Sequence, residues 1–128
     1  MNFFHWVEFT VNIPNVVVTN KTMAAIVQYG HGLFGHQSEV NDDFLVRQAN
    51  ASGWVLGAVD WLGLSVSDEV FAGEMVGTDL SNFPMIPDRC HQGMLNALIL
   101  NRLLTQPSFY TDKSMTFDGR VIVDPTRR

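Results

Sequence analysis

Two short apolar runs, separated by an amphipathic segment, constrain the fold of this chain more than any other feature. The first run covers residues 23–29 and closes at Gly30, and the second covers residues 55–59. Such runs are typical of strands buried on both faces, as parallel sheets require. The segment 38–51 begins with a serine suited to cap a helix, has an apolar side and is stopped by Gly53. This order predicts one βαβ unit whose strands are parallel and lie as neighbours or near-neighbours.

The residues before this unit predict one more strand. Residues 7–13 alternate between apolar and polar side chains, and Pro14 ends the alternation. The following residues, 15–22, are flanked by polar side chains, and we expect them to form an irregular link.

The residues after the unit predict one long helix. The stretch 61–87 has scattered Gly and Pro and no sustained period, so we expect an irregular excursion with one helical turn near 68–71. Asp88 then caps a helix over 88–104 that is apolar over most of its circumference, which predicts a well-buried helix. A turn and a short strand over 121–123 follow.

These elements predict a single α/β domain over residues 1–128, with a partial, mostly parallel sheet and flanking helices. Hydrophobic residues make up 46% of the chain and charged residues 16%, which is enough to bury a core. The net charge of −5 and the lack of a basic stripe argue against a nucleic-acid partner. No apolar run is long enough to cross a bilayer, and the N-terminus lacks the pattern of a signal peptide, so the compartment stays open.

A glycine-rich loop lies between the first apolar run and the predicted helix. It consists of Gly30, His31, Gly32, Leu33, Phe34 and Gly35. Three glycines at these positions let the backbone turn tightly and leave N–H groups uncovered, which is what an oxyanion hole requires. The same spacing suits an ordinary βα turn. It also matches the G-x-G-x-x-G dinucleotide pattern, with Asp60 near the place of the ribose-binding acid, so the residues alone leave three alternatives.

Three segments together resemble the α/β-hydrolase superfamily, in particular its serine esterases and lipases. Residues 29–35 are similar to the HG-x oxyanion loop of these enzymes, and residues 60–65 are similar to the D-x-R-G-x-S loop that follows the next strand. Residues 91–96 resemble part of a helix that precedes the nucleophile strand in some large bacterial hydrolases. The resemblance extends over residues 7–126, nearly the whole chain.

The resemblance implies a role for the loop residues. The backbone N–H of Leu33 is the implied oxyanion donor, and His31 is implied to shape the loop without acting as a catalytic base. The implied substrate of the intact protein is a small-molecule acyl ester, and we expect no cofactor. Leu62 stands where the family usually has a structural arginine, which puts the anchoring of the second loop in question. Trp61 is the one tryptophan that we expect to reach a substrate pocket.

The nucleophile of this fold has no counterpart in the chain. It occupies a G-x-S-x-G turn between a strand and a helix. Ser65 comes closest, with Gly63 before it, but Ser67 stands at the second glycine position and the preceding strand is the wrong one. In this fold the serine precedes the acid and the histidine, so all three are expected beyond Arg128. Residues 121–128 resemble the lead-in to the nucleophile strand.

The expected function is therefore that of a fragment of an ester-cleaving serine hydrolase, which carries the oxyanion loop and is inactive by itself. The alternative is a small α/β binding module whose glycine loop binds an anion, a nucleotide or a partner. A sheet without its later strands leaves a central strand as an edge. We therefore expect the isolated chain to be marginally stable and to self-associate through this edge.

Metal binding is not expected from this sequence. His31 and His36 are close in the chain to Asp42 and Asp43, but a metal site needs three or four converging ligands. The single cysteine, Cys90, excludes an internal disulfide and is expected to be a small apolar residue of the buried helix.

Overall fold

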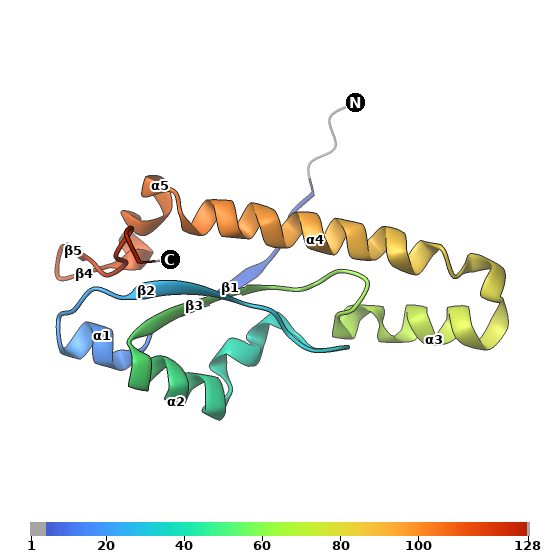
Figure 1. Ribbon diagram of the computed structural model, residues 1–128, viewed down its shortest axis with the longest axis horizontal. Helices are drawn as coiled ribbons and strands as arrows, with labels where there is room; N and C mark the ends of the chain where they lie inside the picture. Colours follow the sequence, from blue (N-terminus) through green and yellow to red (C-terminus); the bar gives the residue numbers. More distant parts are fainter. Residues whose placement is uncertain (1–4, 128) are drawn as a thin grey trace.

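The computed structural model describes residues 5–127, which form a three-layer α/β arrangement around a small sheet (Figure 1). The central strand is β3 (Trp54–Val59). It pairs in antiparallel fashion with β1 (Phe9–Asn12) and in parallel fashion with β2 (Ala25–Tyr29), so that the strand order is β1-β3-β2.

The strand β3 is central because it is apolar on both faces. Val55 and Val59 belong to the larger core cluster, whereas Leu56 and Ala58 belong to a second cluster on the opposite face. Successive side chains of a strand point to opposite faces, so each cluster lies between the sheet and one layer of helices. Gly57 lies against the tip of Leu104, which brings the long helix close to the strand.

Helices cover both faces of the sheet (Figure 1). The helix α4 (Met85–Leu104) lies along the face of the larger cluster. The 3₁₀ helix η1 (Gln37–Asn41) and the helix α2 (Asp43–Ser52) lie on the other face, where Val40 and Ala49 are buried. The connection from β2 to β3 runs through α2, as the βαβ pattern predicts.

The remaining elements are short. They are α1 (Asn15–Thr19), η2 (Val66–Asp68), α3 (Glu69–Thr78), η3 (Leu80–Asn82), α5 (Pro107–Tyr110), η4 (Lys113–Met115), β4 (Thr116–Phe117) and β5 (Arg120–Val121). The helix α3 lies alongside the N-terminal half of α4, beyond the end of the sheet (Figure 1). The expected turn before the last strand is present, with Asp118 and Gly119 at φ angles of 51° and 71°.

The coarse α/β class and the parallel pairing of the two apolar runs are confirmed. The expectation of a mostly parallel sheet is wrong, because the sheet is mixed: β1 runs antiparallel to β3. The irregular link expected over 15–22 is also wrong, because α1 occupies its first half. Tertiary contacts override the weak helix propensity of its valines, since Val17 is buried and the Val16 N–H donates to the Asn50 side chain at 3.2 Å.

Two helices differ from their expected bounds. The helix expected over 38–51 is split, because η1 begins one residue earlier and Asp42 separates it from α2 in an extended conformation. The stretch 61–87 contains a full helix, α3, where only one turn was expected. The sequence of α3, EVFAGEMVGT, has no one-sided apolar pattern, on which a prediction of a helix from the sequence depends. None of its residues is buried.

The helix α4 differs from its expected start and from its expected burial. It begins at Met85, so that Pro87 and Asp88 lie in its first turn and Asp88 is not its cap. It is also not well buried. Its buried residues are Gly93, Asn96, Leu100 and Leu104, while the rest of its circumference exposes Met94, Leu95, Leu98 and Ile99. The covered side of α4 faces the sheet and the loop after β3.

The outer side of β2 is largely open. Val123 forms an isolated parallel bridge with Ala24, in which the Ala24 N–H donates to the Ile122 carbonyl and the Asp124 N–H donates to the Ala24 carbonyl. Beyond Ala24 no described strand pairs with this side of β2. Self-association through this edge stays a prediction. Among the residues that the structure describes, no helix combines the length and the hydropathy needed to cross a membrane.

Candidate functional site

The loop that follows β2 is held in a strained turn. The Gly35 N–H donates to the Gly32 carbonyl at 2.9 Å, which closes a four-residue turn. Phe34 lies inside this turn with φ 56°, a left-handed conformation that is rare for a bulky residue. Its N–H donates to the Leu64 carbonyl of the neighbouring loop at 2.6 Å. Strain of this kind persists only where surrounding contacts fix the backbone, and it is concentrated at functional sites.

Leu33 occupies the tip of this turn. Its N–H meets no acceptor among the described residues, whereas the N–H groups of Phe34 and Gly35 are both engaged. Leu33 as a whole residue is 70% exposed, which places the tip of the turn at the surface of the molecule. A fixed and unengaged N–H can donate to an oxygen on which negative charge develops.

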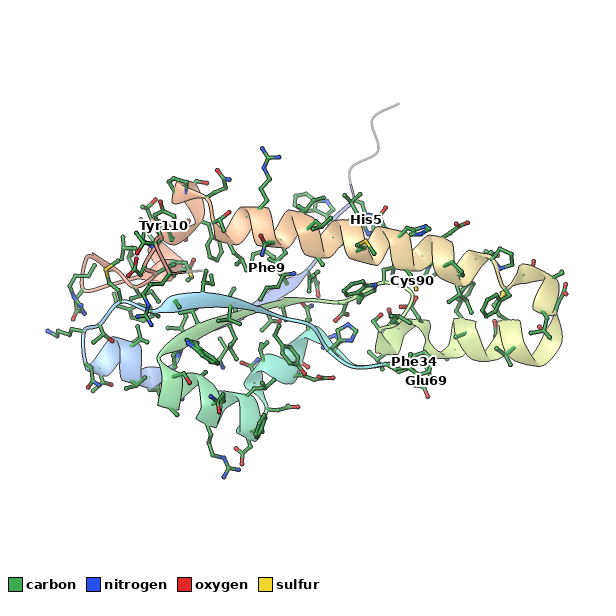
Figure 2. All side chains as sticks on the ribbon, in the orientation of Figure 1. His5, Phe9, Phe34, Glu69, Cys90 and Tyr110 are labelled. Carbon is green, nitrogen blue, oxygen red and sulfur yellow. The ribbon has the colours of Figure 1, made fainter. Side chains whose placement is uncertain are left out.

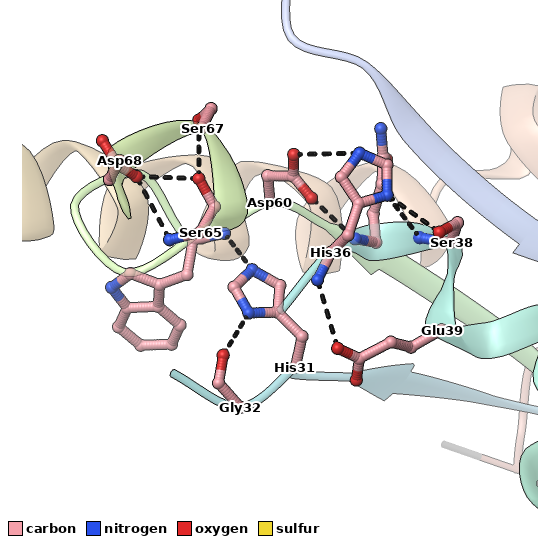
Figure 3. Close-up of polar contacts among 11 residues, drawn as sticks. His31, Gly32, His36, Ser38, Glu39, Asp60, Ser65, Ser67 and Asp68 are labelled. Atoms are coloured by element: carbon pink, nitrogen blue, oxygen red, sulfur yellow. Dashed lines mark hydrogen bonds and ion pairs between the residues drawn. The ribbon is translucent and has the colours of Figure 1, made fainter. Parts of the chain in front are cut away.

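His31 joins the loop after β2 to the loop after β3 (Figure 3). Its Nε2 accepts from the Trp61 backbone N–H at 2.8 Å, so the ring proton lies on Nδ1, which donates to the Gly32 carbonyl at 2.7 Å. Both ring nitrogens are therefore engaged. This geometry fits the loop-shaping role that the resemblance implies for His31 and leaves no nitrogen available to act as a base.

The loop glycines are not equivalent. A Cβ at Gly35 would collide with the Glu39 side chain and approach both the Gly32 carbonyl and His31 Cβ at 3.0 Å. A Cβ at Gly30 or Gly32 would meet nothing within 4 Å. Packing thus favours glycine at Gly35, and the other two leave the backbone near Leu33 uncovered.

Asp60 is engaged by the residues that follow the glycine loop. Its Oδ1 accepts the Gln37 N–H at 2.6 Å, and its Oδ2 lies 3.5 Å from His36 Nε2. A ribose hydroxyl would have to compete with these partners. The geometry therefore does not favour the dinucleotide alternative.

A serine–histidine–aspartate arrangement, which was not predicted from the sequence, is formed by Ser38, His36 and Asp60 (Figure 3). His36 Nδ1 lies 2.9 Å from Ser38 Oγ and also accepts the Ser38 N–H at 3.1 Å, while Glu39 completes a capping box at the start of η1. The backbone N–H groups beside Ser38 are all engaged, by Asp60, by the His36 ring and by the His36 carbonyl. With no N–H left for an oxyanion, the arrangement is a helix cap and not a nucleophilic site.

Asp68 anchors the loop after β3 and was not foreseen from the sequence. Its carboxylate is fully buried, and its Oδ2 accepts the Gly63 N–H at 2.7 Å and both the N–H and the hydroxyl of Ser65 at 3.1 and 2.7 Å. Its Oδ1 accepts Nε of Arg89 at 2.8 Å and also the Arg89 Nη2. Burial raises the pKa of Asp68, but hydrogen bonds from Ser65, Arg89 and Gly63 outweigh it and leave the pKa below its usual value.

Two glycines let α4 approach this loop closely. Gly63 has φ 93°, and a Cβ there would lie 2.7 Å from both the N and the Sγ of Cys90. A Cβ at Gly93 would lie 2.5 Å from the Leu62 carbonyl oxygen and 2.6 Å from Cδ1 of Trp61. The helix and the loop are therefore in backbone contact, with no room for side chains at either glycine.

Trp61 lines an open groove of about 290 Å³ where β2 and β3 end. The groove also touches Gly30, Val59 and Ala97, and the Trp61 Nε1 is buried without a partner among the described residues. Ser65, in contrast, is fully buried and hydrogen-bonded to Asp68, so a substrate has no access to it.

The Tyr29 side chain connects the end of β2 to η1, which packs on the face of the sheet opposite α4. Its hydroxyl donates to Glu39 Oε2 at 2.7 Å, and this bond raises the pKa of Tyr29 and lowers that of Glu39. Within residues 5–127 no group of three histidine, cysteine or acidic side chains is placed to hold a metal ion.

Comparison of the chain with models of known protein families, with curated proteins and with solved structures gives no match.

Proposed function

We propose that this chain forms the oxyanion-loop part of an ester-cleaving serine hydrolase of the α/β-hydrolase type, and that its catalytic serine, acid and histidine come from residues outside these 128. The observation that carries the proposal is the Leu33 N–H. It has no acceptor among the described residues, and it lies at the exposed tip of a strained turn in which the N–H groups of Phe34 and Gly35 are held by hydrogen bonds. A donor fixed in advance in this way can stabilise the oxyanion of acyl transfer without reorganising during the reaction.

The open side of β2 supports this proposal. Val123 enters beside Ala24 in the parallel direction, and no strand among residues 5–127 pairs with the rest of that side of β2. A further strand that ran parallel to β2 there would end at the same edge of the sheet as the glycine loop. A serine at the turn after such a strand would then lie on the Leu33 side of the molecule, as a G-x-S-x-G turn requires.

The anchoring of both loops gives further support. His31, the Phe34 N–H and the parallel bridge between Gly35 and Ser65 tie the glycine loop to the loop after β3. Asp68 and Arg89 tie that second loop to α4. A catalytic amide has to be held within a fraction of an ångström, and these contacts provide such support.

The proposal predicts that the 128-residue chain alone does not cleave esters. Without an activated nucleophile, attack on an acyl carbon has no catalyst, although the oxyanion donor is present. The chain is therefore expected to hydrolyse a short-chain nitrophenyl ester no faster than a matched non-enzymatic protein. Turnover that an active-site inhibitor abolishes would refute the missing nucleophile.

A longer chain that includes the residues after Arg128 gives the positive test. It is expected to contain a strand and a G-x-S-x-G turn within a few tens of residues and to cleave the same ester. Leu33→Pro removes the amide hydrogen and is expected to lower turnover by about 10²–10³-fold, as loss of one oxyanion donor does. Leu33→Ala keeps the N–H and serves as the control, with circular dichroism to show that both variants fold. Equal turnover of the proline variant and the parent would remove Leu33 from the mechanism.

A further inference from the structure

The helix α4 carries a regular stripe of exposed side chains along its length. The stripe has alternate spacings of three and four residues and consists of Asp88, His91, Leu95, Leu98 and Arg102. Each residue of an α-helix is turned by about 100° from the one before it, so residues at these spacings lie on one side of the helix. All five are exposed to solvent. We call these five residues the α4 stripe.

The α4 stripe lies opposite the covered side of the helix. Gly93 packs against the loop after β3, and Leu100 belongs to the core cluster under the sheet. At about 100° per residue, both are turned by roughly half a circumference from Leu95 and Leu98. Figure 2 shows Cys90 on the inner side of α4, and further side chains project from the outer side of the helix. The stripe is therefore on the outer surface of the molecule.

The centre of the stripe is apolar and uncovered. Leu95 is 48% exposed and Leu98 63%, and Met94 beside them is 49% exposed. Alternate spacings of three and four residues are those by which two helices pack side by side along their length. Burial of these leucines against a second helix would remove apolar surface from water, which favours association.

The two ends of the stripe carry opposite charges. Asp88 lies in the first turn of α4 and Arg102 in its last turn, and neither forms an ion pair with a described residue. In an antiparallel pair of these helices with Leu95 level with Leu98, each Arg102 lies about 4.5 Å along the axis from the Asp88 of the other helix, within reach of its side chain. A parallel pair would place like charges together. The stripe is therefore complementary to itself in the antiparallel direction.

We propose that two copies of this chain form a dimer through α4, in which the two stripes pack antiparallel about a two-fold axis between Leu95 and Leu98. Each Leu95 contacts Leu98 of the partner subunit, and each Arg102 pairs with Asp88 of the partner subunit. Because the same surface is used on both subunits, the contact closes as a dimer and does not propagate. It involves no residue of β2.

The dimer is expected to be weak, because two helices in contact over a few turns bury less than the roughly 1,200–2,000 Å² of a stable interface. We expect a dissociation constant of about 10–100 μM, so that the chain is a monomer in the dilute solutions used for unfolding measurements. Sedimentation equilibrium of the 128-residue chain over a range of concentrations measures this constant. A chain that stays a monomer up to millimolar concentration overturns the proposal.

Two matched variants locate the interface. Leu98→Glu places a charge in the apolar centre of the stripe, whereas Phe44→Glu makes a comparable change on α2, which lies on the opposite face of the sheet. Both residues are more than half exposed, at 63% and 74%, so both variants are expected to fold, which circular dichroism checks.

Leu98→Glu is expected to raise the dissociation constant by more than about tenfold, because it buries an unpaired charge at the centre of the contact. Phe44→Glu changes the net charge by the same amount and is expected to leave the constant within about twofold. Association that Leu98→Glu does not weaken runs through another surface, such as the open side of β2, and overturns the proposal. Equal effects of the two variants do so as well.

Exchange of the end charges tests the antiparallel direction. Arg102→Asp or Asp88→Arg alone sets like charges against each other at both ends of the contact, and each is expected to raise the dissociation constant by about fivefold at low ionic strength. The double variant with both changes restores opposite charges and is expected to dimerise within about twofold of the parent. Single changes without effect, or a double variant that dimerises no better than the single ones, overturn the antiparallel arrangement.

Discussion

The buried carboxylate of Asp68 leads to the sharpest prediction about the stability of this protein. Asp68→Asn keeps the size of the side chain but removes the charge and places an N–H₂ group among donors. The parent carboxylate accepts hydrogen bonds from Gly63, Ser65 and Arg89 at a fully buried position. Loss of one partner of a buried ion pair costs about 3–5 kcal/mol.

The lower end of that range applies here, because the Arg89 side chain is 36% exposed and water can partly replace its partner. We therefore expect Asp68→Asn to lower the free energy of unfolding by about 3 kcal/mol, a large share of the roughly 5–15 kcal/mol typical of a domain. For a chain of this size this corresponds to a melting temperature lower by about 10 °C. Urea denaturation followed by tryptophan fluorescence and thermal melting followed by circular dichroism measure the two quantities.

The effect also depends on pH, with a sign that follows from the pKa of Asp68. Its pKa in the folded protein lies below the value in the unfolded chain, which is about 3.9 for an ordinary aspartate. The folded state therefore binds fewer protons, and the carboxylate contributes its full stability above that value. The difference between Asp68→Asn and the parent is expected to be largest near neutral pH and to shrink as the pH falls through the lowered pKa.

Asp88→Asn is the matched control. Asp88 is an exposed carboxylate of the first turn of α4, next to Arg89 in the chain, and it makes no side-chain hydrogen bond with a described residue. Its replacement is expected to change the free energy of unfolding by less than about 0.5 kcal/mol. If Asp68→Asn costs no more than Asp88→Asn, or if its cost does not depend on pH, the reasoning about the buried carboxylate is wrong.

Two further predictions concern the helix–loop contact and the open sheet edge. Gly93→Ala is expected to lower the free energy of unfolding by about 2 kcal/mol or more, because its Cβ would meet the backbone of Leu62. Gly57→Ala is expected to cost less, because its Cβ would meet only the flexible tip of Leu104. Equal losses of unfolding free energy in urea denaturation would show that the contact with Leu62 is not rigid. The unpaired side of β2 is expected to make the isolated chain self-associate, so that its sedimentation coefficient rises with concentration; a monomer at every concentration would contradict this.

The sequence predicted those elements whose signal is local. The runs that became β2 and β3 are apolar throughout, and only a strand with both faces covered accommodates such a run. Their parallel pairing followed from the helix between them, since a parallel connection needs a crossover of that length. The glycine loop was predicted for the same reason, because it directly follows a predicted strand.

Elements that depend on distant partners were not predictable in this way. The helix α1 depends on the Asn50 side chain, and the pair of Asp68 and Arg89 joins residues 21 positions apart. The apolar circumference of α4 predicted burial, but the sequence does not specify how much of a helix its neighbours cover. The cap of η1 could have been predicted from the sequence, because Glu39 follows His36 by three residues, which is the spacing of a capping box.

The loop after β3 is anchored by a residue of α4. The resemblance placed a structural arginine at the position of Leu62, and its absence put the loop in question. The guanidinium that reaches this loop comes from Arg89 on α4, which holds Asp68 and, through it, the backbone of Gly63 and Ser65. Leu64 lies between those two residues, and its carbonyl accepts the Phe34 N–H beside Leu33. Hydrogen bonds and covalent neighbours together therefore connect α4 to the proposed oxyanion donor, so that donor is supported although Leu62 is not an arginine.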